Sequence, residues 1–243
     1  AKDADGKIVW SWHIWVTDQP VEHVYVNDYG TFTVQDRNLG ATRNDRGNGD
    51  EWAQARGLYY QWGRKDPFAF TWNGIYMNSY LFTTDTASKV SIATSIENPN
   101  MFIGCGSSSW EDSGNASMWT KSQKTIYDPC PVGYKVSSYK WMYDYFSNPS
   151  YAYTIYQSYD SGILLYEDPY EMWLPMVGGI NQYGSFTNEL THYHSDYLDT
   201  KNSYGSISSA NFKSSVPLAI LFANPPLPST LSLILGTASI NPL

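Results

Sequence analysis

Tyrosine is the residue type whose number and placement in this chain could contribute most to binding at a surface. Fourteen of the 21 tyrosines lie between Tyr134 and Tyr204, interleaved with Ser, Asn, Asp and Gly. Tyrosine offers a large, rigid contact surface with a hydroxyl group, and its small polar neighbours add adaptable hydrogen bonds, as in antibody combining sites. An aromatic ring also suits the C–H face of a sugar. We therefore expect a ligand-binding surface over residues 139 to 204.

The candidate anchors of that surface flank polar loop residues: Tyr151, Tyr153, Tyr156, Tyr159, Tyr193 and Tyr197. Tyr151 and Tyr153 would share a face in an extended chain, whereas Tyr156 and Tyr159 would share one only in a helix. The alternative is that many of these tyrosines cover the core of a loop-rich fold, because tyrosine also packs well when half buried.

Three groups of residues could hold a metal ion, and each has a plainer interpretation. His192 and His194 would share a face of a strand, but no third ligand stands at a fixed spacing. The oxygen-rich loop 45–51 lacks the spacing of a calcium-binding EF-hand, and Arg46 would oppose a cation. The segment Glu97–Asn100 is similar to the sugar-linked calcium motif of animal C-type lectins, but in a different order. We expect no bound metal and no cofactor.

Motifs for catalysis are absent from the sequence. There is no Gly-x-Ser-x-Gly elbow, no His-Glu-x-x-His pair and no glycine-rich phosphate loop. Cys105 and Cys130 do not form a redox motif, and no cluster of positive charge stands near either to lower a thiol pKa. They could form a disulfide or remain two buried free thiols. The sequence predicts a protein that is not an enzyme.

Composition excludes further classes of function. The net charge of −8 and the pI near 4.8 argue against binding nucleic acid, which needs clustered Lys and Arg. The most apolar stretch, Val216 to Leu243, is broken by four prolines, so we expect no membrane insertion. The chain starts without an initiator Met or a signal peptide, which we interpret as an excised domain.

Strands and loops dominate the expected elements. Asp5-Gly6 is predicted to turn an N-terminal arm whose stretch from Lys7 to Val16 alternates in two faces. A hairpin is expected at Asn27–Gly30, a loop over 42–49, and a short helix from Ser137 or Ser138 through Phe146. Five tryptophans are predicted to pack in the core: Trp10, Trp12, Trp52, Trp62 and Trp173.

Six segments are more specific than composition. They are WSWHIWV (10–16), DRNLGA (36–41), GLYYQWGRKDPF (57–68), IENPNMFI (96–103), KTIYDPCPVGYKV (124–136) and WLPMVGG (173–179). In this order, and over roughly residues 8 to 180, they resemble the "major paralogous domain" family in surface proteins of gut Bacteroidetes, often the C-terminal half of fimbrillin-like proteins.

The resemblance implies a C-type-lectin-like fold at a pilus tip, with a variable loop-rich face for ligand and no established catalytic residues. The chain departs from the family in two places. Nothing after Asn241 matches the family's closing strand with its Arg-Cys pair, and the segment Tyr139–Tyr143 replaces an acidic stretch. From their fixed order and their aromatic and glycine content, which suit buried packing and tight turns, we also predict that the DRNLGA, YYQWGR and DPCP motifs lie together in one scaffold, with Leu39, Trp62 and Cys130 buried.

These observations lead to one set of expectations. We expect an α+β fold over 1–243, one C-type-lectin-like domain whose residues 1–18 form a strand arm from a missing upstream pilin domain. The protein would be extracellular, on a pilus associated with the outer membrane, and bind a glycan or protein on a host or bacterial surface beside other pilin subunits. The alternative is a structural cap of a pilus or surface layer without an external ligand, in which case the tyrosines would be spread or buried.

Overall fold

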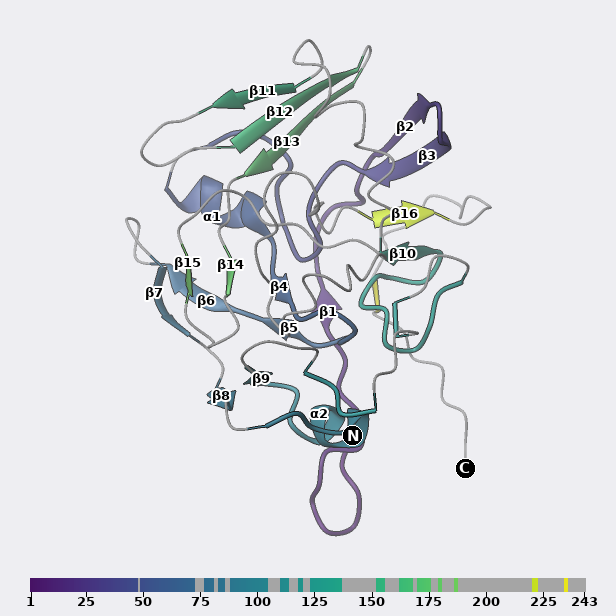
Figure 1. The fold of residues 1–243 in the computed structure, drawn as a ribbon. Coiled ribbons are helices and arrows are strands. Elements are labelled where there is room, and N and C mark those ends of the chain that lie inside the picture. The colour runs from purple at the N-terminus through teal and green to yellow at the C-terminus, as the bar shows by residue number, and fades with distance from the viewer. Residues whose placement is uncertain are drawn as a thin grey trace.

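The structure is a computed structural model of the 243-residue chain, drawn in Figure 1. The residues that it describes are 1–47, 49–72, 77–80, 83–85, 88–104, 110–113, 118–119, 123–136, 152–155, 162–167, 170–175, 179–180, 186–187, 220–222 and 234–235. Within them the fold is mixed, mostly strands with two short helices. This confirms the expectation of a mixed, strand-rich fold with one or two short helices. No helix in these ranges is both long and apolar enough to cross a bilayer.

Most of the strands are short, and the two helices have seven and six residues. The helices are α1 (Asp50–Arg56) and α2 (Ile92–Glu97). The strands are β1 (Ile14–Trp15), β2 (Glu22–Asn27), β3 (Gly30–Gln35), β4 (Tyr59–Tyr60), β5 (Pro67–Phe68), β6 (Phe70–Trp72), β7 (Met77–Tyr80), β8 (Thr83–Asp85), β9 (Met101–Ile103), β10 (Tyr134–Val136), β11 (Ala152–Ile155), β12 (Gly162–Glu167), β13 (Tyr170–Pro175), β14 (Gly179–Ile180), β15 (Phe186–Thr187), β16 (Ile220–Phe222) and β17 (Ile234–Leu235).

Two sheets have more than two strands in the described ranges. One has the order β10-β16-β3-β2, and the other has the order β11-β12-β13. Figure 1 shows the second sheet above α1 at the top of the molecule, next to the β2–β3 hairpin. The remaining described pairs are β1-β17, β4-β5, β6-β7, β14-β15 and β8-β9, of which only β8-β9 is parallel.

The β2–β3 hairpin forms where the turn residues predict it. Asn27 pairs with Gly30 across a two-residue turn, and the Asn27 side-chain oxygen accepts the backbone N–H of Tyr29 at 2.9 Å. Gly30 has φ 135°, a value that favours glycine. His23 and Tyr25 on β2 are buried, whereas Val24 and Val26, which alternate with them, are exposed. Strand β2 therefore has one face against the core, as alternation predicts, whereas β3 becomes more buried along its length.

Residues at the ends of both helices favour their positions through charge or capping. Asp50 and Glu51 place negative charge in the first turn of α1, and Arg56 places positive charge in its last turn. Helix α2 is capped by Ser91, whose hydroxyl oxygen accepts the backbone N–H of Thr94 at 3.1 Å. The start of α1 fits the predicted loop over 42–49. The helix expected over 137–146 lies outside the described residues.

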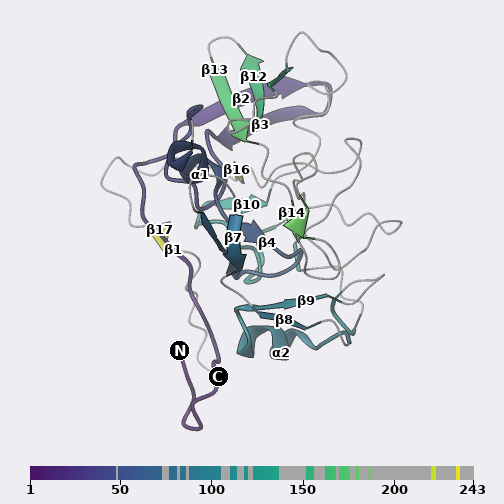
Figure 2. The same ribbon diagram turned by 90° about the vertical axis from the view of Figure 1, so that its left-hand side faces the viewer.

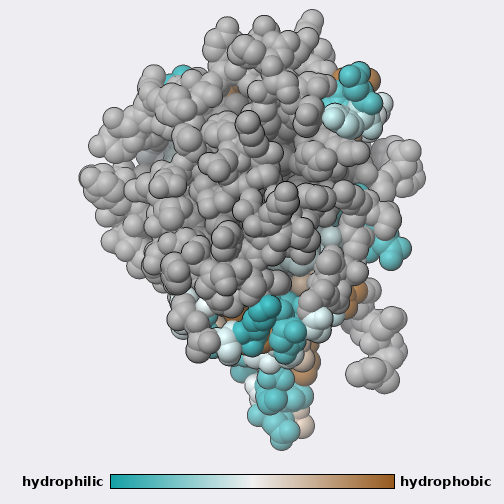
Figure 3. Space-filling model, in the orientation of Figure 1, coloured by the Kyte–Doolittle hydropathy of each residue, from teal (hydrophilic) through white to brown (hydrophobic). Residues whose placement is uncertain are grey.

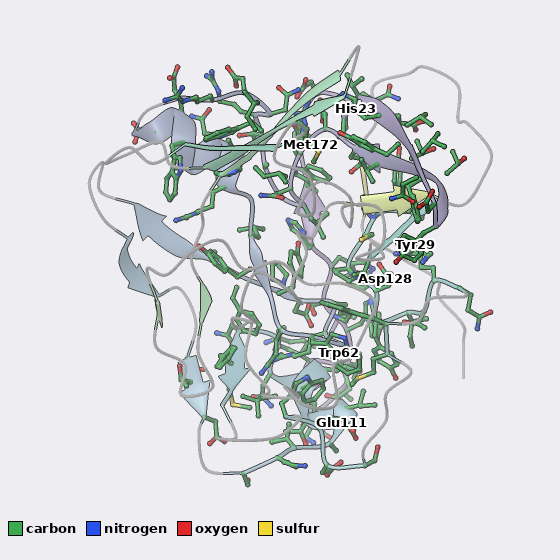
Figure 4. The ribbon with its side chains drawn as sticks, turned by 45° about the horizontal axis from the view of Figure 1, so that its top comes forward. His23, Tyr29, Trp62, Glu111, Asp128 and Met172 are labelled. Atoms are coloured by element: carbon green, nitrogen blue, oxygen red, sulfur yellow. The ribbon has the colours of Figure 1, made fainter. Side chains whose placement is uncertain are left out.

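One hydrophobic cluster joins the sequence motifs. Its buried members are Trp15, Leu39, Tyr60, Trp62, Ile103, Trp110, Met118, Trp119, Cys130 and Val136. Leu39 is 1% exposed, Trp62 7% and Cys130 0%, so the prediction that these three motifs share one buried scaffold is confirmed. Trp62 lies in the middle of the molecule, well inside the side chains around it (Figure 4).

The N-terminal arm has the predicted turn, but it does not place the predicted face toward the core. Lys2 pairs with Ile8 around Gly6, and the hairpin protrudes beyond the body in Figure 2. Trp15 is 3% exposed and donates its indole N–H to the carbonyl oxygen of Ala41 at 2.9 Å. Trp12 is 41% exposed, so the prediction that it packs in the core is wrong.

The exposed face of the arm also includes Ile14 and Val16. The hairpin that protrudes at the bottom of Figure 3 is mostly hydrophilic, with some hydrophobic surface along one side. The alternation separates the two faces of the arm correctly. The face of Ser11, His13 and Trp15 is the one that packs against the body, where Ser11 bonds to Lys65 and His13 to Tyr60. Of the other tryptophans predicted in the core, Trp62 and Trp173 are buried, and Trp10 and Trp52 are half-buried.

Candidate functional site

The structure describes only part of the predicted tyrosine surface. Tyr153 lies in β11, where the backbone is extended over 152–155. Its register partner is Leu164 of β12, which is paired in turn with Trp173 of β13, so the three residues form one row of the sheet. The other predicted anchors lie outside the described residues: Tyr151, Tyr156, Tyr159, Tyr193 and Tyr197.

The sheet that carries Tyr153 is fixed to the core through its other edge. Met172, Trp173 and Leu174 of β13 are buried, and β13 packs against α1. The hydroxyl group of Tyr25 on β2 lies 3.9 Å from the sulfur of Met172 on β13. Figure 4 labels Met172 and, on the same strand as Tyr25, His23. Strand β11 is therefore the opposite edge of the sheet from the anchored strand β13. A scaffold of this kind can hold variable loops in fixed positions.

The acidic loop before α1 is held by an arginine. Arg43 lies 2.6 Å from a carboxylate oxygen of Asp45 and 3.3 Å from one of Glu51. The hydrogen bond from Arg43 lowers the pKa of Asp45, because it stabilises the carboxylate. Arg46 lies with its Cζ 5.9 Å from the ring centroid of Trp173. Two of the carboxylates considered for calcium, those of Asp45 and Glu51, are thus paired with the guanidinium group of Arg43.

The segment Glu97–Asn100 also has structural partners. Glu97 forms an exposed ion pair with Lys7 at 3.1 Å, which ties the arm to α2. The side-chain amide of Asn98 donates to the Thr94 carbonyl, and the Asn98 carbonyl accepts from Arg64 at 3.0 Å. These contacts close helix α2 and leave this segment in a structural role.

Arg64 links two of the recurrent motifs. Its guanidinium group donates to the carbonyl oxygens of Met101, Ser95 and Asn98, at 2.5, 3.0 and 3.0 Å. Gln61 completes the link by donating to the carbonyl oxygen of Ile103 at 2.8 Å. Burial lowers the pKa of Arg64 to about 10, because desolvation disfavours its charge. The YYQWGR and IENPNMFI segments therefore pack through a buried cation.

Asp128 organises the turn that contains Cys130. One carboxylate oxygen accepts the backbone N–H of Cys130 at 2.9 Å, and the other accepts that of Val136 at 2.8 Å. Lys124 lies 2.9 Å from the same carboxylate. Cys130 is a buried free thiol, and burial raises its pKa, with Asp128 adding to the shift. A thiol in this state is a poor nucleophile. Cys105 lies outside the described residues.

A cluster of buried polar side chains, which the sequence did not predict, holds the arm against the body. The Lys65 ammonium lies 2.7 Å from a carboxylate oxygen of Asp66, 2.6 Å from the Ser11 hydroxyl and 3.0 Å from the Ser11 carbonyl. The Ser11 hydroxyl in turn donates to Asp66, and Lys65 also lies 4.5 Å from the ring centroid of Trp10. Sequence gives no signal for contacts between residues more than fifty positions apart.

A serine beside a lysine has the composition of a nucleophile and its base, so this group needs a chemical assessment. Burial lowers the pKa of Lys65, but the adjacent Asp66 opposes that shift. A lysine must be neutral to take a proton, and the ion pair with Asp66 favours the charged form. The arrangement serves to hold Ser11 and the arm against the body.

The histidines divide between the described and undescribed parts. His13 Nδ1 lies 3.0 Å from the hydroxyl oxygen of Tyr60, and His23 is buried on β2. His192 and His194 lie outside the described residues. Within the ranges that the structure describes, no three His, Cys, Asp or Glu residues gather as metal ligands would.

Comparisons with protein-family models, with curated proteins and with solved structures find no match for this chain.

Proposed function

We propose that this chain is a non-enzymatic adhesion module with a C-type-lectin-like fold, carried at the tip of a bacterial surface pilus. It would bind a carbohydrate or protein on a host or bacterial surface and contact other pilin subunits. The proposal places it outside the cell, in a pilus associated with the outer membrane. It rests on the motif resemblance, and one structural observation adds support.

That observation is that the charged side chains of the motifs form bonds within the protein. Arg64, Asp128 and the Lys65–Asp66 pair each bond to backbone or side chains of another motif or of the arm. Cys130 is buried as a free thiol. The described motif residues thus serve packing and positioning, as expected of a scaffold whose function lies in the loops it supports.

The site proposed for the ligand is the surface of residues 139 to 204. Its described part includes the β11-β12-β13 sheet, which is anchored through β13 and has Tyr153 on the edge strand. Tyrosine-rich edges supported by a rigid base suit recognition, because little side-chain freedom is lost on binding.

A structural cap is the second candidate, and the arm favours it. Trp12, Ile14 and Val16 form an exposed apolar face on the segment that would lead in from an upstream domain. Faces of this kind are often covered by a partner subunit. Under this alternative the chain would contact neighbouring pilins and have no external ligand.

A screen of the isolated chain against a glycan array and extracellular-matrix proteins separates the two candidates. Adhesion predicts saturable binding to at least one glycan or protein, retained when Trp12 is changed to Ser. A cap predicts no binding in the screen and loss of assembly with pilin subunits in the same Trp12→Ser variant. Failure of both readouts would remove both proposals.

A further inference from the structure

Strand β2 stands at one end of the four-stranded sheet in the described part of the chain, with β3 as its neighbour. Its six residues pair with β3 in one continuous register without a bulge. Proteins often protect a strand at the edge of a sheet with a lysine, a proline or a bulge. Within Glu22–Asn27 there is no lysine and no proline. The edge of β2 therefore lacks three features that ordinarily prevent another strand from pairing with it.

The backbone of β2 directs N–H and C=O groups toward that edge. Asp36 donates its backbone N–H to the carbonyl oxygen of Val21 at 2.9 Å, so every second residue counted from Val21 bonds to β3. In an antiparallel pair, the residues between these have backbone groups that point away from the partner strand. Val24 and Val26 are such residues. Within the described part of the chain, neither has a backbone hydrogen bond to a further segment.

The side chains along this edge are apolar in the middle and acidic at both ends. Val24 is 42% exposed and Val26 is 66% exposed. Glu22 at the start of the strand and Asp28 in the turn are also exposed. The hydroxyl group of Tyr134 on β10 donates to the carboxylate of Glu22 at 3.2 Å, which helps to hold that carboxylate in place. Figure 1 shows the hairpin at the upper right of the molecule.

A second copy of the chain suits this edge poorly. The antiparallel register that places Val24 opposite Val26 of the second copy also places Glu22 opposite Asp28, and like charges directly opposite each other are destabilising. Each copy has a net charge of −8, which adds repulsion. Charge complementarity favours instead a segment whose apolar side chains are flanked by basic residues.

We propose that the edge of β2 is a docking site for an extended basic segment of a partner protein, which adds to the sheet as an antiparallel strand. Backbone hydrogen bonds to Val24 and Val26 supply affinity, and side chains at alternate positions supply specificity. Two apolar side chains of the segment cover the two valines, and basic side chains at its ends pair with Glu22 and Asp28. The edge is separate in sequence from the tyrosines of residues 139 to 204, and the inference does not rest on the proposed function.

Calorimetric titration of the 243-residue chain with the peptide acetyl-Lys-Thr-Val-Thr-Val-Thr-Lys-amide tests the proposal. The valines of the peptide oppose Val24 and Val26, and its lysines oppose the two acids. The parent is expected to bind the peptide, and hydrogen exchange at the amides of Val24 and Val26 is expected to slow. The same peptide N-methylated at both valines lacks two donors toward β2, so its affinity should fall about tenfold or more. A peptide with glutamates in place of the lysines should also bind more weakly.

Val24→Lys places on the edge the charge that proteins use to protect such strands, and it should abolish detectable binding of the peptide. Val16→Lys is the matched control, because it makes the same change at a valine of the arm that is 70% exposed, and it should bind as the parent does. If Val24→Lys fails to fold by circular dichroism, the N-methylated peptide decides.

Three results would overturn the proposal: no binding by the parent, equal affinity for the N-methylated peptide, or parent-like binding by folded Val24→Lys. Sedimentation that shows a dimer of the parent, dissociated by Val24→Lys, would assign the edge to a second copy and would also contradict it.

Discussion

At the scale of single residues, the buried ion pair of Lys65 and Asp66 holds Ser11 of the arm through hydrogen bonds. The two side chains are 6% and 7% exposed. Changing Asp66 to Asn leaves a buried ammonium without its counter-charge, so we expect the free energy of unfolding to fall by about 3–5 kcal/mol. Urea denaturation of the parent and of Asp66→Asn measures the difference.

The exposed ion pair between Lys7 and Glu97 provides the control. The Lys7 side chain is 62% exposed, so Lys7→Met should change stability by less than about 1 kcal/mol, as for surface ion pairs in general. Equal losses in Asp66→Asn and Lys7→Met would contradict the account of the arm.

His13 gives the stability a dependence on pH with a definite sign. Burial lowers its pKa below the ordinary value of 6.5, and Asp66 opposes this only in part. The folded protein therefore binds this proton less readily than the unfolded chain. Stability from neutral His13 is fully present above about pH 6.5 and is lost as the pH falls below that value.

Changing His13 to Gln removes this titration while keeping a side chain that can bond to Tyr60. The decrease in unfolding free energy between pH 7.5 and pH 5 should be smaller in the variant than in the parent. Burial also lowers the pKa of His23, so part of the decrease should remain. Parallel curves for parent and variant would show that His13 does not titrate as described.

At the scale of elements, the arm gives a direct test of which face is buried. Trp15 is 3% exposed and Trp12 is 41% exposed, three positions apart. Trp15→Ala should lower the free energy of unfolding by about 3–5 kcal/mol, whereas Trp12→Ala should lower it by about 1 kcal/mol or less. The reverse order in chemical denaturation would restore the face predicted from the sequence.

The junction between α1 and β4 depends on a glycine. Gly57 has φ 76°, and a Cβ there would lie 2.7 Å from the backbone oxygen of Leu39. Gly133 has φ 88° with nothing within 4 Å of its Cβ position. Both changes to Ala should cost about 1–2 kcal/mol through left-handed backbone strain, and Gly57→Ala should cost roughly 1–3 kcal/mol more through overpacking. Equal losses in thermal denaturation would show that the close approach at Gly57 does not matter.

The sequence predicted elements that depend on local chemistry. The hairpin at Asn27–Gly30 follows from its turn residues, and the buried positions of Leu39, Trp62 and Cys130 follow from the motifs. It failed at Trp12, because alternation defines two faces but cannot say which one meets the core. Helix α1 had readable signals in its acidic start and in Gly57 after its end, and it was missed as a named element.

At the scale of the whole molecule, the features that could not be predicted from the sequence are contacts between segments far apart in the chain. The bonds of Arg64 to residues 95–101, and of Lys65 to Ser11, join segments roughly 31 to 54 positions apart. For the candidate tyrosine site, the structure shows one anchor, Tyr153, which lies in strand β11 of the anchored sheet. The remaining anchors stay predictions, as do the lectin-like fold and the adhesive function.

The central claim is that tyrosines of residues 139 to 204 bind a ligand, and alanine substitution with a ligand from the array tests it most directly. The variants are Tyr151→Ala, Tyr153→Ala, Tyr156→Ala, Tyr159→Ala, Tyr193→Ala and Tyr197→Ala. Tyr29→Ala is the control, an exposed tyrosine on the β2–β3 turn. At least one of the six folded variants should lose more than about 1 kcal/mol of binding free energy, with Tyr29→Ala unchanged. Parent-like affinity in all six would contradict the account.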